Sequence, residues 1–245
     1  MPSDIHTPSS LEGQTIALIG GSSGLGLAIA AEARRSGADL VLVARDATRL
    51  RHAATALGGA TTITADIADA EAMSALFGDI PHLDHLVITA GTARLLPLAA
   101  HSAHDLTAVL AERLVGPLLA IKAAVPRLRE GGSITLTSAQ LSARPIAAGA
   151  VFAAAVAGVE AMARALALEL APVRVNALAP GLIDTPLLDR ILGDAKPQVL
   201  EASAASVPVR RVGRPQDVAQ AALLLMTNSF ITGEVLHVDG GGRWV

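Results

Sequence analysis

The sequence has no cysteine and no tyrosine among its 245 residues, and only 2% of its residues are aromatic. Without cysteine, disulfide bonds and thiolate chemistry are excluded, which is compatible with a reducing compartment. Without tyrosine, every mechanism that needs a phenol is excluded before any motif is considered. The two absences limit which side chains can act as nucleophiles or as proton donors.

Charge of one sign and long apolar runs are also scarce. The formal net charge is −3, and no block of Lys and Arg is present, so we expect no nucleic-acid partner. No uninterrupted apolar stretch reaches the roughly 20 residues that span a bilayer. The opening MPSDIHTPSS has neither the basic nor the apolar region of a signal peptide. We therefore expect a cytoplasmic protein with no membrane partner. The seven histidines show no metal-ligand spacing with carboxylates, so we also expect no metal.

Short runs rich in β-branched residues alternate with longer Ala-rich segments. TIALIG is followed by LGLAIAAEARRSG and LVLVA, and the rhythm returns through TTITA, HLVITA, SITLT, VRVNAL and EVLHVD. The apolar runs lack polar alternation, which is typical of parallel strands covered on both faces. The sequence predicts an α/β fold, a single-domain, doubly wound parallel sheet of the Rossmann type with helices on both faces. Helices are expected from Asp46, from Asp69 to Phe77, from about Ser102 to Leu128, from about Ala147 to Leu170 and from Pro215 to Met226.

One domain accounts for this pattern. Residues 1–14 are polar and turn-rich, and we expect them to form a flexible leader before order begins at Thr15. Residues 15–245 form the predicted dinucleotide-binding domain. Within it, the stretch of about 183–207 is broken by Pro, Gly and Asp and leaves the sheet, so it is the candidate lid.

A glycine-rich turn, Gly20-Gly21-Ser22-Ser23-Gly24-Leu25-Gly26, follows the first expected strand, and the next helix begins inside it. Glycine lets the backbone approach a pyrophosphate, while a helix N-terminus offers free N–H groups and partial positive charge. A plain tight connection between a strand and a helix has the same composition. The surrounding sequence has to decide between the two interpretations.

The spacing G-x-x-x-G-x-G with Ser-Ser inside resembles the short-chain dehydrogenase/reductase family, and further motifs follow in order over residues 15–242. These motifs include the strand that ends at Ser138 and the tail FITGEVLHVDGG. Ile19 replaces the family's usual Thr and Ile88-Thr89 replace an Asn pair, so two polar anchors are expected to be lost. The cofactor-binding residues implied by the resemblance are Gly20, Ser22, Ser23, Gly24, Leu25, Gly26, Arg45, Asp66, Ile67, Ala90, Gly91, Pro180, Gly181, Ile183 and Thr185.

The end of the second expected strand bears on the choice of cofactor. A carboxylate there accepts bonds from the ribose 2′-OH and repels a 2′-phosphate. The sequence instead has Ala44 and Arg45, which leave room for the phosphate and offer it a bidentate partner. NADP is therefore the predicted cofactor. The alternative is that Arg45 is a solvated cation paired with Asp46.

The resemblance also implies an active site that this chain lacks. The family delivers a proton from a Tyr, assisted by a Lys four residues later, with a Ser that polarises the substrate and an Asn on the preceding helix. Ser138 is at the expected place, but Phe152 and Val156 occupy the Tyr and Lys positions, and Arg113 occupies the Asn position. Neither Phe nor Val can move a proton.

Few groups remain to replace the proton donor. The hydroxyl of Ser138 is too weak an acid without a base beside it. Arg113 and Arg144 stay protonated and can at best stabilise an oxyanion. His101 and His104 are further candidates, although solvated or capping side chains would have the same pattern.

Three functions are compatible with this pattern. The first is an NADP(H)-dependent oxidoreductase with an altered proton path and a small apolar carbonyl or imine-type substrate. An iminium needs hydride without a proton, and Val151, Phe152, Ala153 and Val156 would suit an apolar body. The second is a catalytically weak or inactive NADP(H)-binding or sensing protein. The third is a lyase or dehalogenase that has dropped the nucleotide, but such relatives alter the glycine turn and keep a Tyr.

The resemblance implies a homo-oligomer, a dimer or a homotetramer. The smooth helix face of Ala155, Gly158, Val159 and Met162 is a candidate for packing between subunits, and Trp244 could be buried in a neighbour. Contacts within one chain would explain the same residues.

Overall fold

Seven parallel strands form one sheet in the order β3-β2-β1-β4-β5-β6-β7, in a computed structural model that describes residues 10–245. The strands are β1 (Thr15–Ile19), β2 (Asp39–Ala44), β3 (Thr61–Thr64), β4 (Leu83–Ile88), β5 (Leu128–Thr137), β6 (Arg174–Pro180) and β7 (Val235–Val238). Their central members are apolar along almost their whole length, because helices cover both faces of the sheet. The predicted doubly wound α/β fold is confirmed.

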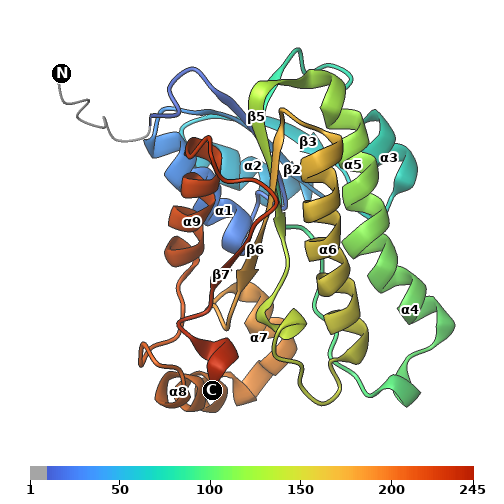
Figure 1. The fold of residues 1–245 in the computed structure, drawn as a ribbon, viewed down its shortest axis with the longest axis vertical. Coiled ribbons are helices and arrows are strands. Elements are labelled where there is room, and N and C mark those ends of the chain that lie inside the picture. Colours follow the sequence, from blue (N-terminus) through green and yellow to red (C-terminus); the bar gives the residue numbers. More distant parts are fainter. Residues whose placement is uncertain (1–9) are drawn as a thin grey trace.

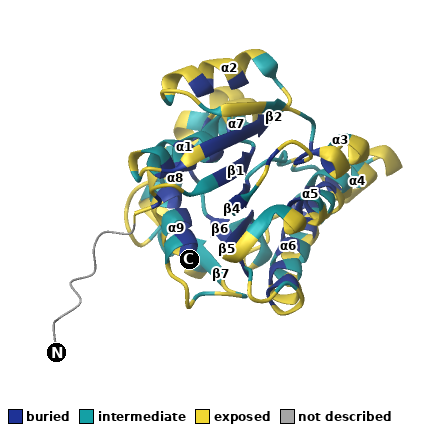
Figure 2. Ribbon diagram, turned by 90° about the horizontal axis from the view of Figure 1, so that it is seen from above, coloured by how far each residue is buried: buried dark blue, intermediate teal, exposed yellow. Residues whose placement is uncertain are grey.

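Two helical layers enclose this sheet (Figure 1). The helices are α1 (Gly24–Arg35), α2 (Ala47–Ala56), α3 (Ala70–Ala75), α4 (Ala103–Leu110), α5 (Gly116–Ala124), α6 (Ala150–Glu169), α7 (Pro186–Leu192), α8 (Lys196–Ser206) and α9 (Pro215–Thr227). One core cluster joins the sheet to α1, α2 and α9, and a second joins it to α3, α5 and α6. Figure 2 shows the buried strands between these layers.

The helix expected from Ser102 to Leu128 is not continuous. It consists of α4, a π-helical turn at Ala111–Val115, α5 and a short 3-10 turn at Val125–Arg127. Pro117 contributes to the interruption, because it has no N–H to donate to the carbonyl of Arg113 four residues earlier. The widened turn presents Glu112 and Arg113 to the loop that follows β4.

The ordered part of the chain begins before Thr15, the residue at which the sequence predicted its start. Leu11 is fully buried in the core, and its N–H donates to the carbonyl of Ser36 at 2.9 Å. The amide oxygen of Gln14 lies 2.7 Å from Nε2 of His85. Thr15 was therefore the wrong boundary for the flexible leader, and its first nine residues lie outside the described part of the chain.

The inner face of α6 packs against the chain's own core. Ala155 and Val159 are buried, and a Cβ on Gly158 would lie 3.1 Å from Cδ2 of Leu114. Ala155 and Val159 were wrongly predicted to join subunits, because the core of the monomer buries them, whereas Gly158 and Met162 are partly exposed and their place in a subunit contact stays a prediction. An 18-residue window of α6 has a mean hydropathy of 1.7, which gives this helix the length and composition of a membrane span, and 39% of that window is buried inside the fold.

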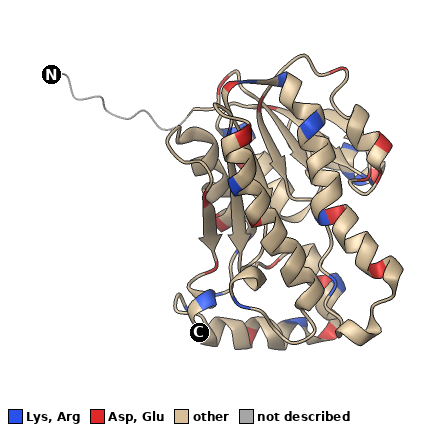
Figure 3. Cartoon of the chain, turned by 45° about the vertical axis from the view of Figure 1, so that its right-hand side comes forward, with Lys and Arg blue, Asp and Glu red and all other residues tan. Residues whose placement is uncertain are grey.

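The strand order reverses between β1 and β4, so the loops after these strands diverge and leave a crevice at the carboxyl edge of the sheet. The lid candidate lies over this edge, where α7 and α8 follow β6. Charged residues of both signs are scattered over the elements without a block of one sign (Figure 3).

Candidate active site

A cavity of about 570 Å³ occupies the crevice at the carboxyl edge. It extends from the start of α2 to the lid helices α7 and α8. All fifteen residues predicted to bind the cofactor line it, as do Ser138, Phe152 and Arg113. The topology thus brings together residues that are spread over most of the sequence.

The glycine turn has the shape that a phosphate cradle needs. Gly20 has a φ of +95°, and a Cβ there would lie 2.6 Å from Oγ1 of Thr89. A Cβ on Gly26 would overlap the carbonyl oxygen of Gly20. Within residues 10–245, the N-cap Ser23 makes no side-chain capping bond, so the first N–H groups of α1 stay available to an anion. The cradle fits a dinucleotide pyrophosphate.

Arg45 occupies the far end of the cavity, where its guanidinium Nη1 lies 3.8 Å from Oδ2 of Asp66. The alternative partner Asp46 is engaged elsewhere. Its carboxylate accepts from the backbone N–H groups of Thr48 and Arg49 and from Nε of Arg49. Asp46 therefore caps α2, with a lowered pKa because of these bonds to Arg49, and Arg45 remains at the cavity wall.

The loop after β4 keeps a polar anchor despite the replaced Asn pair. The hydroxyl of Thr89 donates to the carbonyl of Ile19 at 3.2 Å, and the N–H groups of Thr89 and Ala90 donate to the same carbonyl. The expected loss of an anchor at this position was wrong, because the Thr hydroxyl bonds to the backbone of β1.

Thr92, further along this loop, is held by two residues of the π-helical turn. The N–H and hydroxyl of Thr92 donate to the carboxylate of Glu112 at 2.9 and 2.7 Å. The carbonyl of Thr92 accepts from Nε and Nη2 of Arg113 at 3.2 and 2.7 Å. Arg113 was predicted only at the position of the family's Asn, and nothing in the sequence indicated these bonds to Thr92.

Arg113 is a buried cation. Its guanidinium carbon lies 4.9 Å from the centre of the Phe152 ring, and the residue is only 6% exposed. Burial lowers the pKa of Arg113 to about 10, so the side chain is still charged at neutral pH. Arg113 and Phe152, which the sequence predicts at the positions of the family's Asn and Tyr, thus form a cation–π contact.

Ser138 has a base beside it. Its Oγ donates to Oε1 of Glu160 at 2.7 Å and lies 3.2 Å from the carbonyl oxygen of Val156. Ser142 donates to the same carboxylate oxygen of Glu160. The interpretation of Ser138 as a lone hydroxyl was therefore wrong. The spacing Phe152, Val156 and Glu160 on one helix face was a signal that could have identified Glu160.

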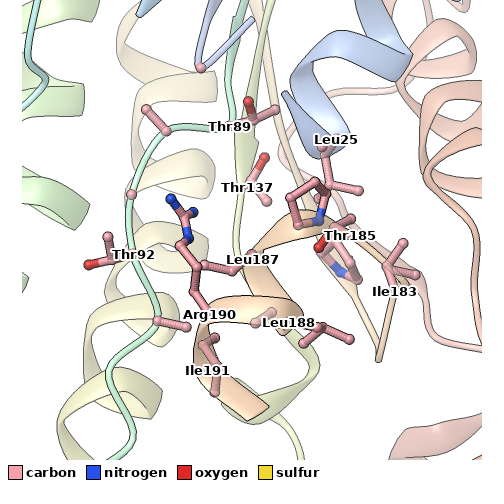
Figure 4. A pocket seen from close by; sticks show the side chains of 18 of the residues that line it. Leu25, Thr89, Thr92, Thr137, Ile183, Thr185, Leu187, Leu188, Arg190 and Ile191 are labelled. Atoms are coloured by element: carbon pink, nitrogen blue, oxygen red, sulfur yellow. The ribbon is translucent and has the colours of Figure 1, made fainter. Parts of the chain in front are cut away.

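The other predicted site residues divide into those that line the cavity and those that do not. Arg144 lines the cavity, and its Nη1 donates to the carbonyl of Gly242 at 2.9 Å. Within residues 10–245, neither His101 nor His104 lines the cavity. Val156 is fully buried and contributes no wall, so of the predicted apolar patch only Phe152 faces the cavity. The apolar lining comes instead from the lid, including Leu187, Leu188 and Ile191 (Figure 4).

Similarity to known proteins agrees with this geometry. A family model described as enoyl-(acyl carrier protein) reductase matches residues 20–242. A galactitol 2-dehydrogenase (L-tagatose-forming) from Cereibacter sphaeroides is 35% identical over 97% of this chain and 98% of its own length. The structure of MalC reductase/Diels-Alderase from Malbranchea aurantiaca matches with a TM-score of 0.90 at 30% identity, covering 96% of this chain and 98% of that one. A small-chain dehydrogenase in complex with NADPH matches with a TM-score of 0.83 at 30% identity, covering 95% and 99%.

The chain belongs to the short-chain dehydrogenase/reductase family of oxidoreductases.

Proposed function

We propose that this protein is an NADP(H)-dependent oxidoreductase that moves the proton through Ser138 and Glu160 in place of a Tyr and Lys. Its substrate would be a small carbonyl or imine-type compound with an apolar body. The observation that carries the proposal is the hydrogen bond of 2.7 Å between Ser138 Oγ and the carboxylate of Glu160. It supplies the base that Ser138 needs, at the wall of a cavity that also contains the nucleotide cradle.

The preference for NADP rests on Arg45. Its guanidinium stands at the cavity end opposite the lid, and its pairing with Asp66 at 3.8 Å is too long for a strong hydrogen bond. A 2′-phosphate offers a better partner for that fork than a carboxylate at this distance. The relative crystallised with NADPH supports this choice of nucleotide.

Bound NADPH would supply a hydride, and the residues of the chain have to handle the proton. In the oxidative direction, Ser138 Oγ accepts the proton of a substrate hydroxyl while its own proton passes to the carboxylate of Glu160. In the reductive direction the same path runs backwards from a protonated Glu160. The hydroxyl of Ser142 holds that carboxylate in place from a second side.

An iminium substrate places a smaller demand on this site. Its carbon accepts hydride without a proton, so the lost Tyr would cost nothing in that step. The carboxylate of Glu160 behind Ser138 also favours a cation over a neutral ketone electrostatically. One solved relative is named a reductase and also a Diels-Alderase, which supports a broad range of substrates on this scaffold.

The test is NADPH consumption with a panel of cyclic imines and small ketones. We expect turnover of at least one class by the wild-type protein, and loss of that turnover in Ser138→Ala with NADPH affinity unchanged. Tight NADPH binding without turnover across the panel would overturn the catalytic proposal.

That second outcome would favour an NADP(H)-binding or sensing protein, the alternative supported by Phe152 and Val156. Neither side chain can transfer a proton, and Phe152 is engaged with Arg113 instead. In that case the nucleotide would act as a structural or regulatory ligand.

We also propose that the protein forms a homo-oligomer, a dimer or tetramer. Phe230 and Trp244 near the carboxyl end are 97% and 76% exposed, and Leu118 and Leu168 lie exposed on α5 and α6. Large exposed apolar side chains are candidates for subunit contacts. Light scattering should give a mass above that of one chain at micromolar concentration, and a monomer would contradict the proposal.

A further inference from the structure

Arg113 is a buried cation without an ion-pair partner in the described part of the chain. Within residues 10–245, no carboxylate lies within ion-pair distance of its guanidinium. The neighbouring Glu112 directs its carboxylate to Thr92 instead. Burying an unpaired charge is costly, and a buried cation normally has a partner. Glu112 is near enough to raise the pKa of Arg113 but forms no ion pair with it, so a direct ionic partner is left to an anion in the cavity that Arg113 lines.

Three neighbours fix this guanidinium in position. Nε and Nη2 donate to the carbonyl of Thr92, and the Phe152 ring covers one face at 4.9 Å. A Cβ on Gly91 would lie 2.8 Å from Nε of Arg113, so glycine there makes room for the cation. Within residues 10–245, Nη1 of Arg113 makes no hydrogen bond. It is not fully enclosed by other protein atoms, so it can donate a hydrogen bond to a ligand in the cavity.

A second arginine approaches from the lid. Figure 4 shows the guanidinium of Arg190 extending from α7 into the cavity that Thr92 and Thr137 also line. In the described part of the chain Arg190 makes no ion pair, whereas its neighbour Asp189 pairs with Lys196 at 2.6 Å. Two arginines from different elements thus reach the same cavity without a carboxylate partner.

The acidic residues of the cavity wall do not balance these cations. Asp46 and Asp66 lie at the Arg45 end, and Glu112 is bound to Thr92. Glu160 is not part of the wall in the described chain and is held by two serine hydroxyls. Arg113 and Arg190 therefore face the cavity without a directly paired carboxylate, while the carboxylate of Glu160 lies behind Ser138.

We infer that the substrate is a carboxylic acid whose carboxylate is bound by Arg113 and Arg190. This inference rests on the proposed oxidoreductase function and names the class of substrate. The cation stacks on the ring at the position where the family delivers its proton, so the carboxylate lies next to the reacting C=O or C=N. The class is therefore a 2-oxo or 2-imino acid with an apolar body.

The rest of the wall fits such a body. Apolar side chains from the loops and the lid surround the same space, and they are Leu95, Leu141, Ile146, Leu187, Leu188 and Ile191. Arginine is suited to the anionic end because its fork can donate two bonds to one carboxylate. An acid with an apolar side chain matches both parts of the wall.

The test compares matched acids and ketones on the full-length protein saturated with NADP⁺, which cannot reduce them. Calorimetry should show phenylpyruvate binding at least about tenfold tighter than phenylacetone, and 2-oxohexanoate tighter than 2-hexanone by a similar factor, because charged hydrogen bonds are stronger than neutral ones. Equal affinities, or no binding of either acid below millimolar concentration, would overturn the inference.

Two variants locate the effect. Arg113→Met and Arg190→Met should each remove most of the preference for the acids, and Arg164→Met on the exposed side of α6 is the matched control. Arg190 is exposed, so its variant keeps the test valid if Arg113→Met fails to fold. If Arg190→Met weakens NADP⁺ binding and leaves the acid preference intact, Arg190 serves the cofactor phosphates and the two-arginine site is wrong.

The same titrations separate this inference from the proposed function. A protein that binds NADP⁺ but shows no preference for the acids refutes the carboxylate site alone. A protein that binds no NADP⁺ refutes the proposed function.

Discussion

The two ends of the one cavity are built in different ways. At the cofactor end, the fit depends on backbone shape, and glycines such as Gly20 and Gly26 stand where a Cβ would collide with the neighbouring backbone or side chain. At the substrate end, the fit depends on side chains, and Phe152, which the sequence predicts at the position of the family's Tyr, stacks on the buried cation of Arg113. The difference fits our proposal that nucleotide binding has been kept while the chemistry next to it has changed.

Adding a side chain to the glycine turn should have the largest effect, because it should weaken nucleotide binding at the cofactor end of the cavity. In Gly26→Ala the new Cβ overlaps the carbonyl of Gly20, so the turn has to move away from the phosphate position. We expect NADPH affinity to fall by at least about a hundredfold, measured by fluorescence titration. Gly78→Ala is the control, because its Cβ would lie 3.5 Å from the carbonyl of Ala75 and far from the cavity. Unchanged NADPH binding in Gly26→Ala would refute the cradle.

Blocking the proposed proton path should lower turnover without changing nucleotide affinity. Glu160→Gln keeps the shape of the side chain but cannot accept the proton of Ser138. Turnover of a carbonyl substrate should fall by about a hundredfold or more, the usual contribution of general acid–base catalysis, with NADPH affinity unchanged. Glu112→Gln is the control for a carboxylate that binds the loop alone. Equal turnover in wild type and Glu160→Gln would exclude Glu160 from the path.

Neutralising the far end of the cavity should change which nucleotide is preferred. Arg45→Ala removes the fork that faces the 2′-phosphate, so NADPH should bind about tenfold more weakly, the value of one charged hydrogen bond. NADH affinity should stay the same. The exposed Arg49→Ala, whose side chain is held by Asp46, should have a smaller effect. A parallel loss for both nucleotides would show that Arg45 acts through the fold.

Replacing the ring under the cation should have the smallest effect. Phe152→Leu keeps an apolar side chain but removes the stacked face under Arg113. The cation–π contact is worth about 1 kcal/mol, which corresponds to a decrease in Tm of about 3 °C for a chain of this length. Calorimetry measures it. A Tm equal to that of the wild type would mean that Thr92 alone holds the guanidinium.

The sequence was sufficient for the features that depend on local chain geometry. The glycine turn and the helix that begins after Asp46 follow from residues close together along the chain, and the parallel sheet follows from the repeated alternation of strands and helices. It was not sufficient where contacts join distant residues. Ser138 and Glu160 are 22 positions apart, and only the packing of α6 beside β5 brings them together.

The break between α4 and α5 could not be predicted from the helical spacing of these residues. The residues from Ala103 to Ala124 have helical spacing throughout, so one helix was predicted. The π-helical turn arises because Pro117 cannot donate and because Arg113 and Glu112 together bind Thr92. Such a turn depends on a loop more than fifteen residues away, and a periodicity argument does not include it.

The most direct test of the central claim needs no substrate. Fluorescence titration of the purified chain with NADPH and with NADH measures the nucleotide end of the cavity alone. We expect NADPH to bind at least about tenfold tighter than NADH, because one guanidinium meets a phosphate in the first case and a hydroxyl in the second. Equal dissociation constants would contradict the assignment of Arg45, and no binding of either nucleotide would contradict the whole account.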